Sequence, residues 1–338
     1  MNTNDIEIRK AMGNWKPNVY LSNLCTAYFE DATYASKRLF PVCPVDLPSG
    51  YFYEFSKADL ARDYVQRKPD NGAVQPAIMG HSDNSYSCHV DQIIIGLDQI
   101  ITLAYQRATA PGMADPRRAR VRTIAEQIVQ HQEIEFARKF FNTGAWTNEW
   151  TGAATADTAN KKFKRFDNSD VDPVDFIDDR IIDIRREGRR NPNKLALGIE
   201  TFKALKNNPA ILERIKYSGT TQNPAIVNEN VLAQVFGVDQ VVVLDATYND
   251  AGIGEPENMK FICDSKGALL LYTPDTPQVD VPSAGYLFTW NLNGGNYTAI
   301  DTFEKNDGSH TDFIEGIIAY DMKKTSDCLA CYMTGCVG

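Results

Sequence analysis

The sequence lacks a long apolar run. No stretch of its 338 residues approaches the roughly 20 consecutive apolar residues that a membrane-spanning helix needs. The opening segment, MNTNDIEIRK, also lacks the apolar centre of a secretory signal. We therefore expect a soluble protein that is synthesised in the cytoplasm and has no membrane partner.

Catalytic signatures are missing as well. The sequence contains no GxxxxGK[ST] phosphate loop, no GxGxxG, no GxSxG and no HExxH motif. It has only four histidines, which leaves few groups for acid–base catalysis by imidazole. We therefore expect no enzymatic activity, no catalytic residue and no cofactor-binding residue.

Positive charge is in deficit. The chain has 35 lysines and arginines against 44 aspartates and glutamates, a formal net charge of −9. A dedicated nucleic-acid binder would instead concentrate lysine and arginine against phosphates, so this class is disfavoured. The seven cysteines are an odd number scattered along the chain. We interpret them as reduced thiols rather than a disulfide framework.

Three groups of potential metal ligands occur, and each is incomplete. A Cys-x2-Cys-x4-Cys pattern near the C-terminus lacks a fourth ligand unless a distant histidine supplies it, so small buried thiols are the simpler interpretation. A His/Cys/His group falls in a polar segment, and three aspartates lack the glycine and glutamate of a calcium loop, which leaves helix capping to explain them. We expect no bound metal. The groups are Cys328, Cys331, Cys336 with His310; His81, Cys88, His89; and Asp170, Asp172, Asp175.

The longest predicted helix spans residues 115–143. Asp115 can cap its start, apolar side chains recur at helical spacing, and Gly144 would end it. At about 1.5 Å per residue it would be roughly 40 Å long, which is typical of a structural spine. His131 and Glu135 share one face of this helix. We interpret them as a solvent-exposed or intersubunit polar contact rather than half of a metal or proton-transfer site.

A second helix is predicted to begin at Asp172. Acidic side chains gather in its first turns and arginines at its end, an order that complements the helix dipole. One apolar stripe would face the core. The acids are Asp175, Asp178 and Asp179, the bases Arg185, Arg186, Arg189 and Arg190, and the stripe Val174, Ile177, Ile181 and Ile184.

The stretch NPNKLALGIETFKALKNNPAILERIKYS, residues 191–218, predicts a strand followed by two helices. A strand, a glycine and a helix in this order often bind a phosphate. Here Glu200 follows Gly198 closely and would repel an anion, so we interpret the stretch as structural. With a helix at 228–236 and the strand QVVVLDATY after it, the stretch predicts a small α/β domain. We expect Leu195, Leu197, Phe202, Leu205, Ile211 and Ile215 to pack a core, and Lys203, Lys206, Glu213 and Lys216 to face water or another copy.

Strands are predicted on both sides of this α/β region. YFYEF and YSCHVDQIIIGL are separated by a long polar segment, which predicts a projecting β-loop that needs a partner to rest on. Toward the C-terminus, KFICD and ALLLY are expected to form one hairpin, and YLFTWN and YTAIDTF another around LNGG. FIEGIIAYDMKK is expected to be the last long strand.

Four segments carry information through their order. They are FPVCPV with GYFYEFSKAD, then DPRRARVRTIAEQIVQHQEIEFARKFFNTGAW, then DPVDFIDDRIIDIRREGRRNPNKLALGIETFKALKNNPAILERIKYS, and then VLAQVFGVDQVVVLDATYN. In this order and spacing, over most of residues 20–290, they resemble successive segments of the major capsid proteins of tailed bacteriophages. The resemblance implies an α+β fold, the common coat fold of tailed phages, encapsulins and herpesvirus shells.

That fold implies a division of the chain. An N-terminal arm would precede an extended β-loop that lies over a neighbouring subunit. The spine helix and the C-terminal strands would belong to a peripheral domain, and the α/β region to an axial domain near the centre of each ring of copies. The expected ranges are arm 1–45, β-loop 46–97, peripheral domain 98–189 with the spine helix at 115–143, axial domain 190–285, and returning strands 286–338.

The resemblance also implies a function. Copies would form pentamers and hexamers, and these an icosahedral head around double-stranded DNA in the virion. The implied partners are other copies, a portal protein, optionally a decoration protein, and DNA bound without sequence specificity. A separate scaffolding protein is expected because arm-like sequence already begins near residue 20. No motif marks Lys57 or Lys68 for covalent crosslinking to an asparagine, so none is expected.

Two alternatives remain open from the sequence. An encapsulin-type compartment would share the fold but enclose cargo enzymes instead of a genome. A soluble α/β enzyme would instead be a compact monomer or small oligomer with a polar pocket. The negative net charge suits a shell, on the hypothesis that an inner wall binding DNA tightly would hinder both packaging and release.

Overall fold

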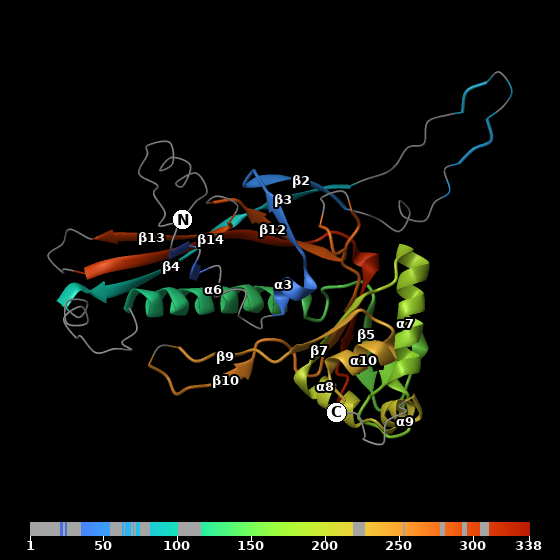
Figure 1. The fold of residues 1–338 in the computed structure, drawn as a ribbon. Coiled ribbons are helices and arrows are strands. Elements are labelled where there is room, and N and C mark those ends of the chain that lie inside the picture. Colours follow the sequence, from blue (N-terminus) through green and yellow to red (C-terminus); the bar gives the residue numbers. More distant parts are fainter. Residues whose placement is uncertain are drawn as a thin grey trace.

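The computed structural model of the chain describes residues 21–22, 24–25, 35–54, 63, 65–68, 70, 72–74, 82–100, 116–218, 227–252, 254–277, 281–292, 296–304 and 311–338. These residues form a five-stranded sheet, a six-stranded sheet and two two-stranded ribbons. Figure 1 shows the five-stranded sheet above a long helix, and the shorter helices gathered at one end of the molecule around the other sheet. The mixed helix and sheet content confirms the predicted α+β class.

The five-stranded sheet is built around its longest strand, β14. Three strands pair antiparallel with β14, and β1 adds to one of them in parallel. The predicted long strand at FIEGIIAYDMKK is thus present, and it lies at the centre of this sheet. The members are β1 (Val42–Val45), β4 (His89–Asp98), β12 (Gly285–Trp290), β13 (Thr298–Glu304) and β14 (Thr311–Lys324).

The long helix α6 (Pro116–Phe140) packs along this sheet through its buried face. Its 25 residues give a length of about 37 Å. Gly316 of β14 allows the close approach, because a Cβ there would lie 2.3 Å from the Cγ2 atom of Ile124. The predicted spine helix is thus present, while Asp115, its expected cap, lies outside the described residues.

The end of the expected N-terminal arm packs into the body of the molecule. The short helix α3 (Ser36–Leu39) lies against α6, where the buried Glu133 carboxylate accepts a hydrogen bond from the backbone N–H of Ser36 at 2.9 Å. Phe40 is buried against aromatic rings of α6. Apolar side chains of residues 35–45 are therefore part of this chain's own core.

The six-stranded sheet has the strand order β6-β5-β15-β11-β7-β8. Its strands come from distant parts of the chain, and β15, almost at the C-terminus, lies between β5 and β11. Residues before 189 and after 285 thus share a sheet with the segment between them, so the predicted divisions at these residues do not follow the sheets. The members are β5 (Glu149–Ala153), β6 (Lys162–Lys164), β7 (Lys194–Gly198), β8 (Gln240–Leu244), β11 (Ala268–Leu271) and β15 (Ala330–Thr334).

Helices α7 to α10 pack around this sheet, and α7 and α10 begin where their caps predict. The side chains of Asp172 and Asn228 each accept a hydrogen bond from a backbone N–H two or three residues on, at 3.0 Å. No helix among the described residues is both long and apolar enough to cross a membrane. The bounds are α7 (Pro173–Gly188), α8 (Ile199–Asn207), α9 (Pro209–Ser218) and α10 (Glu229–Phe236), with short 3₁₀ turns at η1 (Thr158–Asn160) and η2 (Asp327–Leu329).

The pattern of residues 194–216 is also as predicted. The six apolar positions expected in the core are buried or half-buried, and they pack with the core of the six-stranded sheet. The four charged positions expected at the surface are exposed. The helical spacing of apolar residues was therefore sufficient to find the buried face of α8 and α9.

Both predicted hairpins are wrong. β10 (Met259–Phe261) pairs with β9 (Thr247–Asn249) in a separate ribbon, whereas β11 lies between β7 and β15. β12 and β13 do not pair with each other, because each pairs with β14. Turn residues between two strands predicted that those strands pair with each other. Instead, β11, β12 and β13 pair with strands from other parts of the chain.

Candidate assembly surfaces

A two-stranded ribbon leaves the body beside the five-stranded sheet. It consists of β2 (Ser49–Glu54) paired antiparallel with β3 (Ser82–Ser87). Phe288 of β12 holds its base: the ring stacks on Tyr86 at 4.8 Å between centroids and lies 5.3 Å from the ring of Phe52. The root of the ribbon is thus fixed in the core of its own chain.

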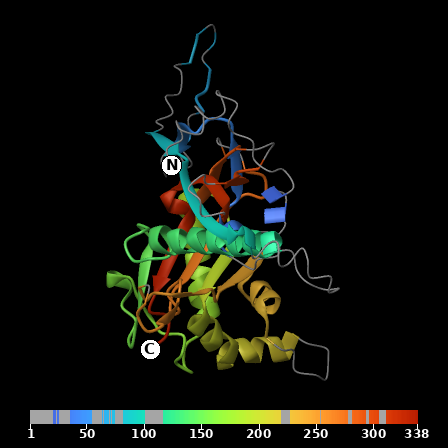
Figure 2. The ribbon, with the colours of Figure 1, turned by 90° about the vertical axis from the view of Figure 1, so that its left-hand side faces the viewer.

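The ribbon and the described residues between its strands also expose apolar side chains. Tyr51 is 77% exposed and Val65 is 89% exposed. In Figures 1 and 2 the described residues between β2 and β3 lie far from the rest of the molecule, as expected for the projecting loop. Lys68 is exposed there, whereas Lys57 and His81 lie outside the described residues. Apolar side chains on such a projection favour contact with another molecule.

The β9–β10 ribbon is a second exposed apolar surface. Met259 and Phe261 lie on the same face because side chains alternate along a strand, and they are 61% and 43% exposed. On the other face, the Lys260 ammonium donates to the Asp250 carboxylate at 2.6 Å. Sequence analysis missed this surface, although the alternation Met-Lys-Phe is a signal of a strand with one apolar face.

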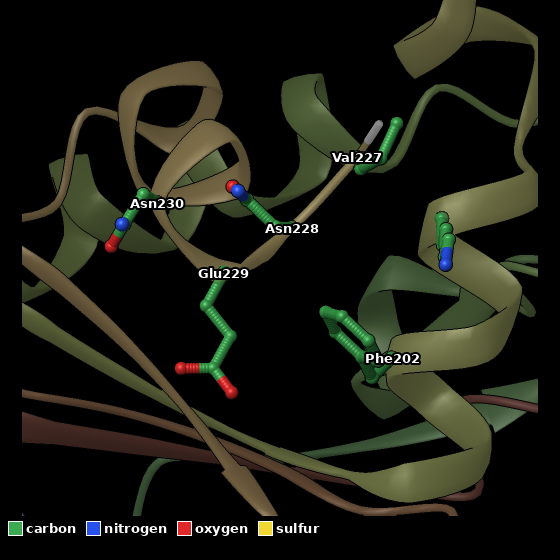
Figure 3. A pocket seen from close by; sticks show the side chains of 6 residues that line it. Phe202, Val227, Asn228, Glu229 and Asn230 are labelled. Carbon is green, nitrogen blue, oxygen red and sulfur yellow. The ribbon is translucent and has the colours of Figure 1, made fainter. Parts of the chain in front are cut away.

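A pocket of 380 Å³ lies between α8 and the start of α10. Figure 3 shows Phe202 on one side of it and Asn228 with Glu229 on the other. Asn228 already caps α10, and Glu229 lies 3.9 Å from a guanidinium nitrogen of Arg38. The described residues that line this pocket include no histidine, cysteine or serine. They therefore do not supply a nucleophile with an adjacent imidazole base.

The start of α8 is closed by the chain itself. The Ser265 carbonyl accepts hydrogen bonds from the backbone N–H groups of Glu200 and Thr201 at 3.0 and 3.2 Å, and the Ser265 hydroxyl donates to the Glu200 carboxylate at 2.8 Å. A Cβ at Gly198 would lie 2.4 Å from the Asp264 carbonyl oxygen. The backbone of Asp264 and Ser265 occupies the position where a phosphate would bind, in agreement with the structural interpretation of this stretch.

The cysteines do not gather into a ligand set. All seven are buried and unbridged. Cys328 packs in the core beside α6, whereas Cys331 and Cys336 pack in the core of the six-stranded sheet, and burial raises the pKa of both of these thiols. Cys88 is buried and its neighbour His89 is exposed. Within the described ranges no three histidine, cysteine or acidic residues could hold a metal together; His310 lies outside them.

His131 has a partner within its own chain. Its Nε2 atom lies 3.6 Å from the Asp91 carboxylate of β4. Their direct side-chain interaction is the main cause that raises the pKa of His131 and lowers that of Asp91. Glu135 instead contacts Lys139 one turn along α6. His131 is exposed, as the solvent-exposed alternative predicted, and its contact with Asp91 joins α6 to β4.

The three aspartates near α7 serve the helix and its neighbours. Asp172 caps α7 and also accepts from Arg214 of α9 at 2.5 Å. Asp170 lies 3.8 Å from the Lys164 ammonium, and Asp175 is an exposed residue of the first turn. This arrangement agrees with capping rather than with a calcium loop.

Comparison with known proteins agrees with this geometry. No protein-family model matches the chain. The major capsid protein of Burkholderia phage BcepMu is 26% identical to it over 232 residues, which cover 68% of this chain and 69% of that protein. The sequence relationship thus spans about two thirds of both chains.

Solved structures extend the likeness to nearly the whole chain. A phage-related protein from Bordetella bronchiseptica RB50 matches 95% of this chain and 97% of its own, with 19% identity and a TM-score of 0.71. The capsid of cyanophage P-SCSP1u matches 90% and 88%, with 10% identity and a TM-score of 0.53. The chain therefore has the coat fold of tailed phages. The sequence relative bears the name of a major capsid protein, so this relative and the fold both agree with the resemblance to phage capsid proteins.

Proposed function

We propose that this chain self-associates into pentamers and hexamers that close into an icosahedral phage head. The observation that carries the proposal is the β2–β3 ribbon, whose root is fixed by Phe288 while Tyr51 and Val65 remain exposed. A projection that buries little apolar surface in its own chain can bury it against a neighbouring copy. Repeated head-to-tail contacts of this kind close into rings. This role requires no catalysis.

We further propose which parts of the chain form the two domains of the coat fold. The five-stranded sheet with α6 is the peripheral domain, and the six-stranded sheet with α7 to α10 is the axial domain near the centre of each ring. This assignment follows the sheets, so β5, β6, α7 and β15 belong to the axial domain. Of residues 46–97, we assign those before β4 to the extended loop, because β4 itself pairs with β14 in the five-stranded sheet.

The proposed partners follow from the proposed shell. They are other copies of this chain, a separate scaffolding protein, a portal protein and optionally a decoration protein, in a virion assembled from protein made in the host cytoplasm. The packaged double-stranded DNA would be held without sequence-specific binding. The net charge of −9 supports this, because a wall with few excess cations releases few counterions from phosphate.

Electron microscopy of the purified protein, made with and without its candidate scaffolding protein, tests the proposal. We expect closed shells of uniform diameter when the scaffold is present. A well-behaved monomer that never assembles would contradict it. That outcome would favour the soluble α/β enzyme.

The contents of the shells separate the phage head from an encapsulin-type compartment. Particles purified from infected or induced cells would be treated with nuclease and then opened. Protected double-stranded DNA of genome length supports a phage head, whereas a protein cargo without DNA would support the compartment.

A further inference from the structure

The β9–β10 ribbon has an apolar face that its own chain leaves exposed. Met259 and Phe261 lie on this face and are 61% and 43% exposed. On the opposite face Lys260 pairs across the strands with Tyr248, and the two side chains donate to Asp250 at 2.6 and 3.2 Å. The polar face is therefore satisfied within the ribbon, whereas the apolar face would gain stability by packing against another surface.

The residues that connect the two strands make the ribbon acidic. Residues 247–261 contain Asp250, Glu255 and Glu257 but only one base, Lys260. Asp250 is already paired with Lys260, and Glu255 and Glu257 are exposed. A surface complementary to this ribbon would therefore combine an exposed apolar side chain with positive charge.

The second half of α7 has both properties. Ile182 is 59% exposed, although the other isoleucines of this helix are buried or half-buried. Arg185 and Arg186, three and four positions after it, share its face and are exposed. Arg186 binds Asp183 at 2.6 Å, yet its side chain remains 69% exposed. The exposed acids of α7 precede Ile182 along the helix, so the ribbon is expected to lie toward the arginines.

The ribbon and α7 lie on opposite sides of the six-stranded sheet. In Figure 1 the ribbon extends from the left of this sheet, and α7 stands at its right. Identical copies around a ring axis meet through different surfaces, so each copy can offer its ribbon to one neighbour and α7 to the other. In Figure 1 the described residues between β2 and β3 also project on the α7 side. The neighbour that receives this projection is therefore the one whose β9–β10 ribbon would reach α7.

We propose that the apolar face of the β9–β10 ribbon packs on Ile182 of the next copy in the ring, with Glu255 and Glu257 near Arg185 and Arg186. The inference rests on the proposed self-assembly and specifies one contact within its rings. Because exposed ion pairs are individually weak, the contact is expected to act in assembled rings rather than to hold two free subunits together.

Photo-crosslinking tests which surface the ribbon meets. Benzoylphenylalanine replaces Met259, the shells are isolated by size and irradiated, and the crosslinked peptides are identified by mass spectrometry. We expect covalent multimers in which position 259 is joined to the segment of another copy that contains Ile182. The matched control places the same photoreactive residue at Tyr248, an aromatic position on the opposite face of the ribbon. We expect several-fold less crosslinking to α7 from that position.

The outcomes separate the contact from the shell. Shells in which position 259 crosslinks elsewhere, for example to Leu212, the other exposed large apolar residue among the described residues of α7 to α10, would overturn the α7 contact. Shells without a crosslink, or with equal crosslinking from positions 248 and 259, would also overturn it. All of these outcomes leave the proposed function intact, whereas failure of the unmodified chain to form shells would contradict that function. If the variant at position 259 does not assemble, charge reversal decides.

Charge reversal tests the polar part of the contact independently. The double variant Glu255→Lys/Glu257→Lys places like charges opposite Arg185 and Arg186, and we expect the yield of shells to fall several-fold. The thermal stability of the free subunit should not change, since both glutamates are exposed. Adding Arg185→Glu and Arg186→Glu restores opposite charges and should restore the yield. A double variant that assembles normally, or a folded quadruple variant that assembles no better than the double variant, would overturn the contact.

Discussion

At the scale of single residues, Gly198 shows why a position that resembles a ligand site is structural. Its missing side chain admits the backbone of Asp264 and Ser265, which caps α8. The glycine is needed because another part of the chain approaches it. A single sequence shows the glycine but not what approaches it.

Gly198→Ala is therefore expected to destabilise the subunit by about 2 kcal/mol or more, since the added methyl group would overlap backbone atoms that have little room to move. The matched control is Gly252→Ala, where the nearest atom to a Cβ is a flexible glutamate side chain at 3.8 Å. We expect that control to stay within about 0.5 kcal/mol of the unmodified chain. Chemical denaturation of both variants measures the difference. Equal stabilities would contradict the role given to Gly198.

Glu133 is a buried carboxylate that holds α3 on the spine helix. Burial raises its pKa above the ordinary value of 4.5, although the hydrogen bonds from Ser36 act in the opposite direction. The folded state thus binds a proton more tightly than the unfolded state. The stabilising contribution of this group is complete below pH 4.5 and is lost as the pH rises through the folded-state pKa.

Glu133→Gln keeps an oxygen for the Ser36 N–H and removes the titration. We expect its stability relative to the unmodified chain to increase from acidic to neutral pH. Glu133→Ala leaves that buried N–H without its partner and should cost about 1–3 kcal/mol or more at any pH. Thermal unfolding across this pH range is the measurement. A glutamine variant whose difference from the unmodified chain does not change with pH would contradict the assigned shift.

At the scale of elements, the β2–β3 ribbon separates folding from assembly. Its base is part of the core, but the described residues beyond the base are largely exposed. Replacing residues 55–81 with a short turn should leave the thermal stability of the subunit nearly unchanged and abolish shell formation. Calorimetry and light scattering measure the two effects. Shells of normal yield without the loop would contradict its role in assembly.

Phe288→Ala is the complementary change. It removes the ring on which Tyr86 stacks and is expected to destabilise the subunit by about 3–5 kcal/mol, as for other buried phenylalanines. A large loss of stability for Phe288→Ala and a small one for the loop deletion would show that the core includes the base of the ribbon but not the loop beyond it. If Phe288→Ala and the loop deletion had similar stabilities, the base of the ribbon would not be part of the chain's own core.

The sequence predicts elements better than it predicts their partners. Asp172, Asn228 and Gly237 mark helix ends because capping depends on residues a few positions apart. The position of β14 between β12 and β13 depends on contacts that no local pattern encodes. For the same reason the long polar segment indicated a projecting loop, whereas the stacking of Phe288 that anchors it emerged only from the fold.

At the scale of the whole molecule, the segment order of the sequence indicated the coat fold, and the structure adds how its two sheets share the chain. Within the predicted arm, residues 35–45 contribute apolar side chains to the core. A pattern of apolar residues does not tell whether their partners lie in the same chain or in another. That distinction decides which surfaces remain for assembly.

The most direct test of the proposed assembly is a cryo-electron microscopy reconstruction of particles formed by this chain. We predict rings of five and six copies in which the β2–β3 ribbon of each copy lies on a neighbour, with Tyr51 buried in that contact. A protein that stays monomeric, or a particle in which the ribbon folds back on its own chain, would contradict this prediction.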